Sequence, residues 1–139
     1  MPNPGFASVQ VGDSLPALTA KPLTRQTLAV YCGASGDHNP VHVDSDFARA
    51  AGLDDVIAHG MLIMSYMSRT LTDWVPQNRV RSFNTRFMAI THIGDEITCT
   101  AKVVEKFTRD AENLVRIAIA AADQRGEVKT QGEALIALP

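Results

Sequence analysis

The stretch VIAHGMLIMSYMSRTL, residues 56–71, decides the fold. Its apolar residues recur at helical spacing and no proline follows until Pro76, so it predicts a buried helix from His59 or Gly60 to about Trp74. A glycine at a helix start lets a ligand approach closely. Its free N–H, at the positive end of the helix dipole, can polarise a carbonyl or hold an oxyanion. A plain glycine at the start of a core helix is the alternative, and this stretch taken alone favours it.

Beyond this helix the pattern changes to strands. Enrichment in β-branched residues, or alternation of apolar and polar residues, predicts strands at residues 80–87, 96–108, 113–123 and 127–138. Turns are expected at residues 94–95, 109–110 and 125–126. We expect a four-stranded antiparallel meander that buries one face against the side of the helix carrying Met61, Met64, Met67 and Leu71.

Shorter elements precede the helix. Residues 9–13 read as a short strand and turn, and Thr24 is placed to cap a helix that runs to Gly33. A second short helix is expected through Phe47 and Ala51, with a turn at Gly52. Helices followed by a sheet predict an α+β fold.

The segment SGDHNPVH, residues 35–42, carries the candidate chemistry. Gly36, Asn39 and Pro40 start turns, so the backbone can fold back and bring Asp37 and His42 together. An imidazole with a pKa near ~6.5 and an adjacent carboxylate form a site suited to proton transfer. Asp and Asn also cap helices, and a helix start without chemistry is the alternative reading.

Length and composition limit the function classes. We expect residues 1–139 to form one domain, because the chain is long enough for a single core only. Thirteen basic and fifteen acidic side chains are scattered along the chain, which argues against a nucleic-acid partner. No apolar run approaches the ~20 residues that span a bilayer. The N-terminus lacks the basic and apolar stretches of a secretory signal, so we expect a cytoplasmic protein without a membrane partner.

Metal and thiol chemistry are not indicated. Cys32 and Cys99 lie far apart, outside any Cys-x-x-Cys spacing, and read as buried small hydrophobic residues. A catalytic thiol at Cys32 is the less favoured alternative. We therefore predict no metal site.

Two motifs together resemble the MaoC-like dehydratases and (R)-specific enoyl-CoA hydratases of the hot-dog fold. The first family motif has an aromatic residue and then Gly-Asp-x-Asn-Pro, an aliphatic residue and His. Tyr31 and residues 36–42 fill these places. The second motif is the string Ala-His-Gly-Met-Leu at residues 58–62. A weaker third element, Arg-Phe followed by Gly-Asp, is present at residues 86–87 and 94–95, but the prolines that the family commonly has between them are replaced by residues 90–93.

The resemblance implies an antiparallel sheet wrapped around a long central helix and reversible hydration of a trans-2-enoyl thioester to an (R)-3-hydroxyacyl thioester. It carries Asp37 and His42 over as catalytic. Gly60 is expected to supply the oxyanion donor, and Asn39 to orient Asp37 or fix the loop. It implies no metal or organic cofactor, a CoA or acyl-carrier-protein thioester as substrate, and a homodimer as the minimum assembly, with a higher oligomer or a heterodimer also open.

Two rival functions remain. Other hot-dog proteins hydrolyse acyl-CoA with an acidic residue and water, and some dehydratases pair a catalytic chain with a non-catalytic one. The retention of both Asp37 and His42 favours a catalytic chain. His38 and His92 are given no role, and His59 is expected to fix the turn before Gly60.

Overall fold

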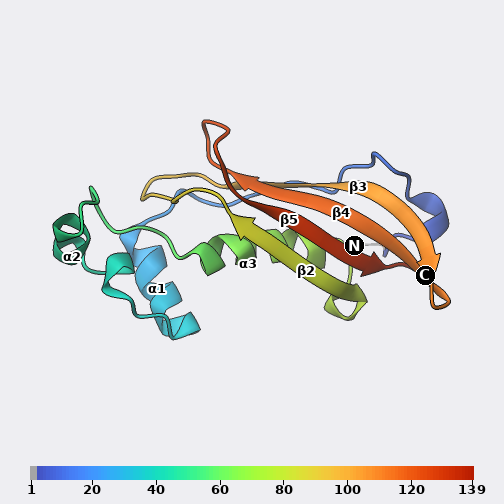
Figure 1. The fold of residues 1–139 in the computed structure, drawn as a ribbon, viewed down its shortest axis with the longest axis horizontal. Helices are drawn as coiled ribbons and strands as arrows, with labels where there is room; N and C mark the ends of the chain where they lie inside the picture. Colours follow the sequence, from blue (N-terminus) through green and yellow to red (C-terminus); the bar gives the residue numbers. More distant parts are fainter. Residues whose placement is uncertain (1–2) are drawn as a thin grey trace.

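A computed structural model describes residues 3–139. A curled five-stranded antiparallel sheet lies over the helix α3, Gly60–Thr72, while α1 and α2 lie beyond one end of the sheet (Figure 1). The other helical elements are α1, Arg25–Ser35; α2, Ser45–Ala50; and the 3₁₀ turns η1, Phe6–Ser8; η2, Pro40–His42; and η3, Gln77–Arg79. The strands are β1, Leu18–Thr19; β2, Val80–Phe87; β3, Thr98–Arg109; β4, Glu112–Ala122; and β5, Val128–Ala137. The predicted α+β fold, a sheet around a central helix, is confirmed. No helix in residues 3–139 is long and apolar enough to cross a membrane.

The prediction of which face of α3 is buried is partly wrong. Met67 and Leu71 are buried against the sheet as expected, but Met61 is 55% exposed. Three residues turn a helix through about 300°, so a stripe at a spacing of three drifts by about 60° at each step. Met61 therefore leaves the face that holds Met67. The side chains of α3 that are buried are Leu62, Ile63, Met67, Thr70 and Leu71.

The predicted sheet order is also wrong. The strands follow the order β1-β3-β4-β5-β2, so β3, β4 and β5 form a meander, but β2 pairs with β5 instead of β3. The reason is that the other edge of β3 is already occupied. Gly12 N–H donates to the Val103 carbonyl at 2.8 Å, Leu15 N–H donates to the Ala101 carbonyl at 2.9 Å, and β1 continues the pairing.

The N-terminal segment forms less regular structure than predicted. Of the short strand and turn expected at residues 9–13, only the turn forms, at Gly12 with a φ of +99°. The 3₁₀ turn η1 precedes this segment. Pairing with β3 continues to β1, which is only two residues long. Pro16 and Pro22 flank β1 and lack the N–H that a longer ladder needs.

The element boundaries elsewhere follow the pattern closely. Thr24 caps α1, its hydroxyl accepting from Thr27 N–H at 3.1 Å, and the helix runs two residues beyond the predicted end at Gly33. The predicted bounds of β2 match the structure, and those of the other long strands differ by one or two residues. Both cysteines are buried, as expected.

Candidate active site

The end of α1 sets the position of Asp37. Gly36 ends the helix in the left-handed region, with a φ of +75°, and its N–H donates to the Cys32 carbonyl at 3.0 Å. Glycine adopts this conformation without a steric penalty, so the chain can reverse directly before Asp37. The backbone N–H of Asn39 donates to Asp37 Oδ1 at 3.2 Å. The carboxylate is thus oriented by its own loop.

Asn39 fixes the next turn as well. Its side-chain Oδ1 accepts from Val41 N–H at 3.1 Å and caps η2, whose first residue is Pro40. The short turn that follows carries His42 back toward Asp37. The two roles expected of Asn39 are therefore divided between its backbone, which contacts Asp37, and its amide, which shapes the loop.

His42 is held in a defined tautomer. Its Nδ1 lies 2.7 Å from the backbone carbonyl of Ile57. A carbonyl only accepts, so Nδ1 carries the hydrogen and Nε2 of the neutral ring has the lone pair. Nε2 lies 3.8 Å from Asp37 Oδ2. The His42 side chain is only 12% exposed, whereas that of Asp37 is 51% exposed, so the pair opens to solvent on the Asp37 side.

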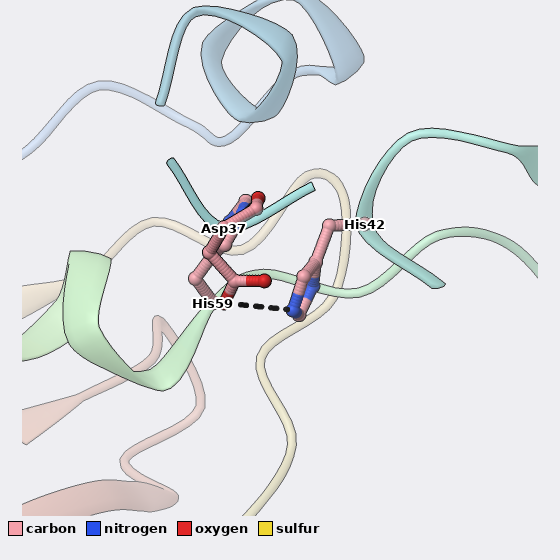
Figure 2. A group of neighbouring side chains, drawn as sticks. All are labelled: Asp37, His42 and His59. Carbon is pink, nitrogen blue, oxygen red and sulfur yellow. Dashed lines mark hydrogen bonds and ion pairs between the residues drawn. The ribbon is translucent and has the colours of Figure 1, made fainter. Parts of the chain in front are cut away.

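His59 joins this pair, in closer contact than the sequence indicated. Figure 2 shows the side chains of Asp37, His42 and His59 converging from the loop and from the start of α3. The rings of His59 and His42 stack at a centroid distance of 3.7 Å, and His59 Nε2 donates to the backbone carbonyl of Asp37 at 3.2 Å. His59 is only 1% exposed. The one sequence signal for this role is its place directly before Gly60.

The surroundings of His59 keep it neutral. Burial lowers its pKa and the proximity of His42 lowers it further, while the hydrogen bond to the Asp37 carbonyl and the charge of the Asp37 carboxylate partly oppose this effect. Cys32 Sγ lies 3.5 Å from Nε2, and the Tyr31 ring packs edge-on at 4.7 Å. His59 Nδ1 is buried and has no hydrogen-bond partner among residues 3–139. His59 therefore serves the two predicted residues as a neutral, stacked support.

Gly60 and His42 line a cavity at the start of α3. Gly60 is the first residue of α3, where helical N–H groups have no intrahelical acceptor. A Cβ built on Gly60 would lie 2.9 Å from the Phe87 ring, so any larger residue at the helix start would require this ring to shift. The cavity has a volume of about 230 Å³. Its lining includes His42, Gly60, Ile63, Phe87, Ile90 and Lys129.

Three potential ligand groups are close enough to consider a metal. The ligand atoms of Asp37, His42 and His59 all lie within 4.8 Å of one another. The two rings are stacked at an interplanar angle of 22°, so their nitrogens point side by side and do not converge on one point. One nitrogen of each ring is also committed to a backbone carbonyl. The arrangement suits proton transfer better than metal binding, and the expectation of no metal stays a prediction.

The remaining histidines lie apart from the cavity. His38 is exposed on the loop. His92 is exposed as well, and its backbone forms a bridge with Ile57. Neither side chain was given a role. Lys129, which lines the cavity, was missed because a lone lysine in an alternating strand normally faces solvent.

Comparison with known proteins places this chain in a family. The family profile described as MaoC like domain matches residues 7–124. The chain belongs to this family. The resemblance that the two sequence motifs indicated is therefore confirmed.

Two relatives and one solved structure are similar to this chain over most of its length. An (R)-specific enoyl-CoA hydratase of Rhodospirillum rubrum is 30% identical over 136 residues, covering 96% of this chain and 91% of the relative. A mitochondrial 3-hydroxyacyl-[acyl-carrier-protein] dehydratase of Arabidopsis thaliana is 28% identical, covering 94% and 78%. The R-hydratase PhaJ1 of Pseudomonas aeruginosa superposes with a TM-score of 0.84 at 29% identity, covering 99% and 86%. The prediction of a hydro-lyase is confirmed at the level of these relatives.

Proposed function

We propose that this protein catalyses the reversible hydration of a trans-2-enoyl thioester to an (R)-3-hydroxyacyl thioester. The names of the relatives support the reaction class, with CoA or acyl-carrier protein as the carrier. The observation that carries the proposal is the 3.8 Å separation of Asp37 Oδ2 and His42 Nε2, beside the cavity at the start of α3.

That separation suits a water molecule. At 3.8 Å the two atoms are too far apart for a direct hydrogen bond, but one water can lie within hydrogen-bonding distance of both. Ionised Asp37 and the neutral Nε2 of His42 are both acceptors, so the water donates one hydrogen to each. Its remaining lone pairs are then free to face the substrate. In this arrangement Asp37 orients the water and His42 accepts its proton.

The water then adds across the C2–C3 double bond. The water oxygen forms a bond to C3, the C2–C3 π electrons move toward C2 and the thioester oxygen, and the proton passes to His42 Nε2. The same nitrogen returns that proton to C2, and the (R)-3-hydroxyacyl thioester is complete. Delivery of both groups from one side of the cavity is consistent with addition to one face.

Gly60 stabilises the charge that develops on the thioester oxygen. Its N–H lies at the start of a thirteen-residue helix, where the dipole favours negative charge. A single donor of this kind typically lowers the barrier by about 3 kcal/mol. The acyl group would occupy the cavity lined by Ile63, Phe87 and Ile90.

We infer further that the assembly is at least a homodimer. Strand β2 is the last strand of the sheet and pairs only with β5 among the described strands. Exposed apolar side chains lie at its end and around the cavity: Met61, Phe87, Met88 and Ile90. A free strand edge beside an apolar surface favours pairing with a second copy. The cytoplasmic location expected from the sequence stays a prediction.

The test is the absorbance of crotonyl-CoA at the enoyl-thioester band with purified protein. We expect the band to decay with the wild-type protein and not with Asp37→Asn or His42→Ala. His38→Ala is the matched control, because this exposed histidine neighbours Asp37 without facing the cavity, and it should remain active. A steady band with the wild-type protein, repeated with a longer enoyl chain and with a carrier-protein substrate, would overturn the proposal in favour of a non-catalytic chain.

Thioester hydrolysis is distinguished in the same experiment. Release of free thiol from acyl-CoA, measured with a thiol reagent, would indicate a thioesterase. Hydration leaves the thioester bond intact and releases no thiol.

A further inference from the structure

A buried lysine lies at the wall of the cavity. Lys129, the second residue of β5, is only 1% exposed. Its Nζ donates to the backbone carbonyl of Ile90 at 2.9 Å and bonds to Glu127. Asp123 Oδ2 lies 3.4 Å away and Asp95 Oδ2 lies 3.7 Å away. A buried ammonium group with three carboxylates is costly to build unless its charges are all paired.

The lysine remains charged in this environment. Burial alone would lower its pKa, but the hydrogen bond to Glu127 and the charges of Asp95, Glu127 and Asp123 together raise it. Arg125 pairs with Asp123 at 2.7 Å and with Asp95 at 3.5 Å. The cluster therefore contains two cations and three anions, held together at one end of the sheet.

The same lysine holds the loop between β2 and β3. Its Nζ bonds to the Ile90 carbonyl, and its backbone carbonyl accepts from Met88 N–H at 2.8 Å and from Ala89 N–H at 3.2 Å. Three consecutive residues of the loop are thus attached to one residue. Asp95, from the cluster, accepts from His92 N–H at 2.8 Å and attaches the far side of the loop.

The loop in turn holds residues 57–60. The Thr91 carbonyl accepts from Ala58 N–H at 2.9 Å, and His92 forms a bridge with Ile57. Every group of the proposed reaction depends on this four-residue segment. The Ile57 carbonyl orients His42, His59 holds the Asp37 backbone, and Gly60 supplies the oxyanion donor.

We propose that Lys129 is a positioning residue for the hydratase site, which aligns His42 by fixing the loop at residues 88–92 and, through it, the Ile57 carbonyl. This inference rests on the proposed function of Asp37 and His42. A replacement of Lys129 removes the Nζ bond to the Ile90 carbonyl and leaves the two backbone bonds at Met88 and Ala89. The loop then loosens from Ile90 onward, the Ile57 carbonyl shifts with it, and His42 Nδ1 loses the acceptor that selects its tautomer. Misplacement by about 1 Å at a reacting group can cost about 100-fold in rate.

The test compares Lys129→Met with Lys106→Met. Lys106 Nζ also donates to backbone carbonyls, those of Phe6 and Val9, but it lies near the opposite end of the sheet. We expect Lys129→Met to lower kcat roughly 10-fold to 100-fold, because the base that accepts the water proton is misaligned. Lys106→Met should retain the wild-type kcat.

A second measurement needs no substrate. The ¹⁵N chemical shifts of the His42 imidazole report which nitrogen carries the hydrogen. We expect a single Nδ1–H tautomer in the wild-type protein and in Lys106→Met, and a mixture of tautomers in Lys129→Met. A loss of packing elsewhere in the molecule would not change this signal.

A charge-matched variant separates positioning from folding. If Lys129→Met alone does not fold, it is combined with Asp123→Asn. The double variant removes one cation and one anion, so the cluster keeps its net charge. An unchanged tautomer and unchanged kcat in a folded Lys129 variant overturn the inference. An inactive wild-type protein would instead overturn the proposed function, and a tautomer change in Lys129→Met would still establish the link to His42.

Discussion

At Gly60 a single absent methyl group determines both packing and chemistry. A Cβ at this position would lie 2.9 Å from Phe87 Cε1 and 3.0 Å from Phe87 Cδ1. Phe87 is 52% exposed, so its ring can shift outward at small cost to folding. The narrowed cavity would displace the thioester oxygen from the Gly60 N–H. We therefore predict that Gly60→Ala lowers kcat/KM about tenfold or more while the melting temperature changes little.

Gly33→Ala is the control for this prediction. A Cβ on Gly33 meets nothing within 4 Å, and the residue lies inside α1. Alanine in a helix interior is favoured over glycine by about 1 kcal/mol, so this variant should be slightly more stable and fully active. If Gly60→Ala were as active as Gly33→Ala, the proposed oxyanion donor would be wrong.

At His59 the buried, neutral ring predicts a pH dependence of stability. Burial lowers the pKa of His59 in the folded protein. Between the folded and unfolded pKa values, the unfolded chain therefore binds a proton that the folded protein does not bind. The stability that neutral His59 contributes is complete above the unfolded pKa of about 6.5 and is lost as the pH falls below it. The melting temperature should fall from about pH 7.5 to about pH 5, and less steeply in His59→Gln. Equal slopes in both proteins would contradict this account.

The chemistry of single residues was only partly predictable from the sequence. Asp37 and His42 are close in sequence and separated by turn-forming residues, so local pattern suffices to bring them together. His59 and Lys129 reach the site through tertiary contacts. Their roles depend on the stacking against His42 and on the path of the loop at residues 88–92, and no local pattern encodes either.

At the scale of elements, local patterns predicted where the strands lie in the sequence but not which strands pair in the sheet. Alternation and β-branched enrichment located β2 to β5 within two residues, because these signals arise within each strand. The position of β2 beside β5 depends on which segment of the chain occupies each edge of the sheet. The N-terminal segment occupies the outer edge of β3 through the Gly12 and Leu15 N–H groups, and β2 pairs at the opposite edge.

The pairing of β2 with β5 depends on Gly132. Thr85 and Gly132 are partners across the two strands, and a Cβ on Gly132 would lie 1.9 Å from the Asn84 carbonyl oxygen. Backbone cannot move aside as a flexible side chain can. We predict that Gly132→Ala lowers the free energy of unfolding by about 3 kcal/mol or more, measured by denaturant titration. Gln131→Ala, the exposed neighbour on the same strand, should change it by less than about 0.5 kcal/mol. A wild-type midpoint for Gly132→Ala would show that β2 can separate from β5 without cost.

At the scale of the whole molecule, the apolar surface next to β2 has a testable consequence. Phe87 and Met88 are 52% and 51% exposed at the end of the edge strand, and Met61 and Ile90 are exposed nearby. If a second copy covers this surface, a charge placed there must be buried without a partner, at a cost of several kcal/mol. Sedimentation equilibrium should give a dimer for the wild-type protein and a shift toward monomer for Met88→Glu. Val11→Glu, a substitution at a 59% exposed valine outside the sheet, should leave the dimer intact. A wild-type monomer at micromolar concentration would mean that the cavity at Gly60 is complete within one chain and that the apolar surface has another partner.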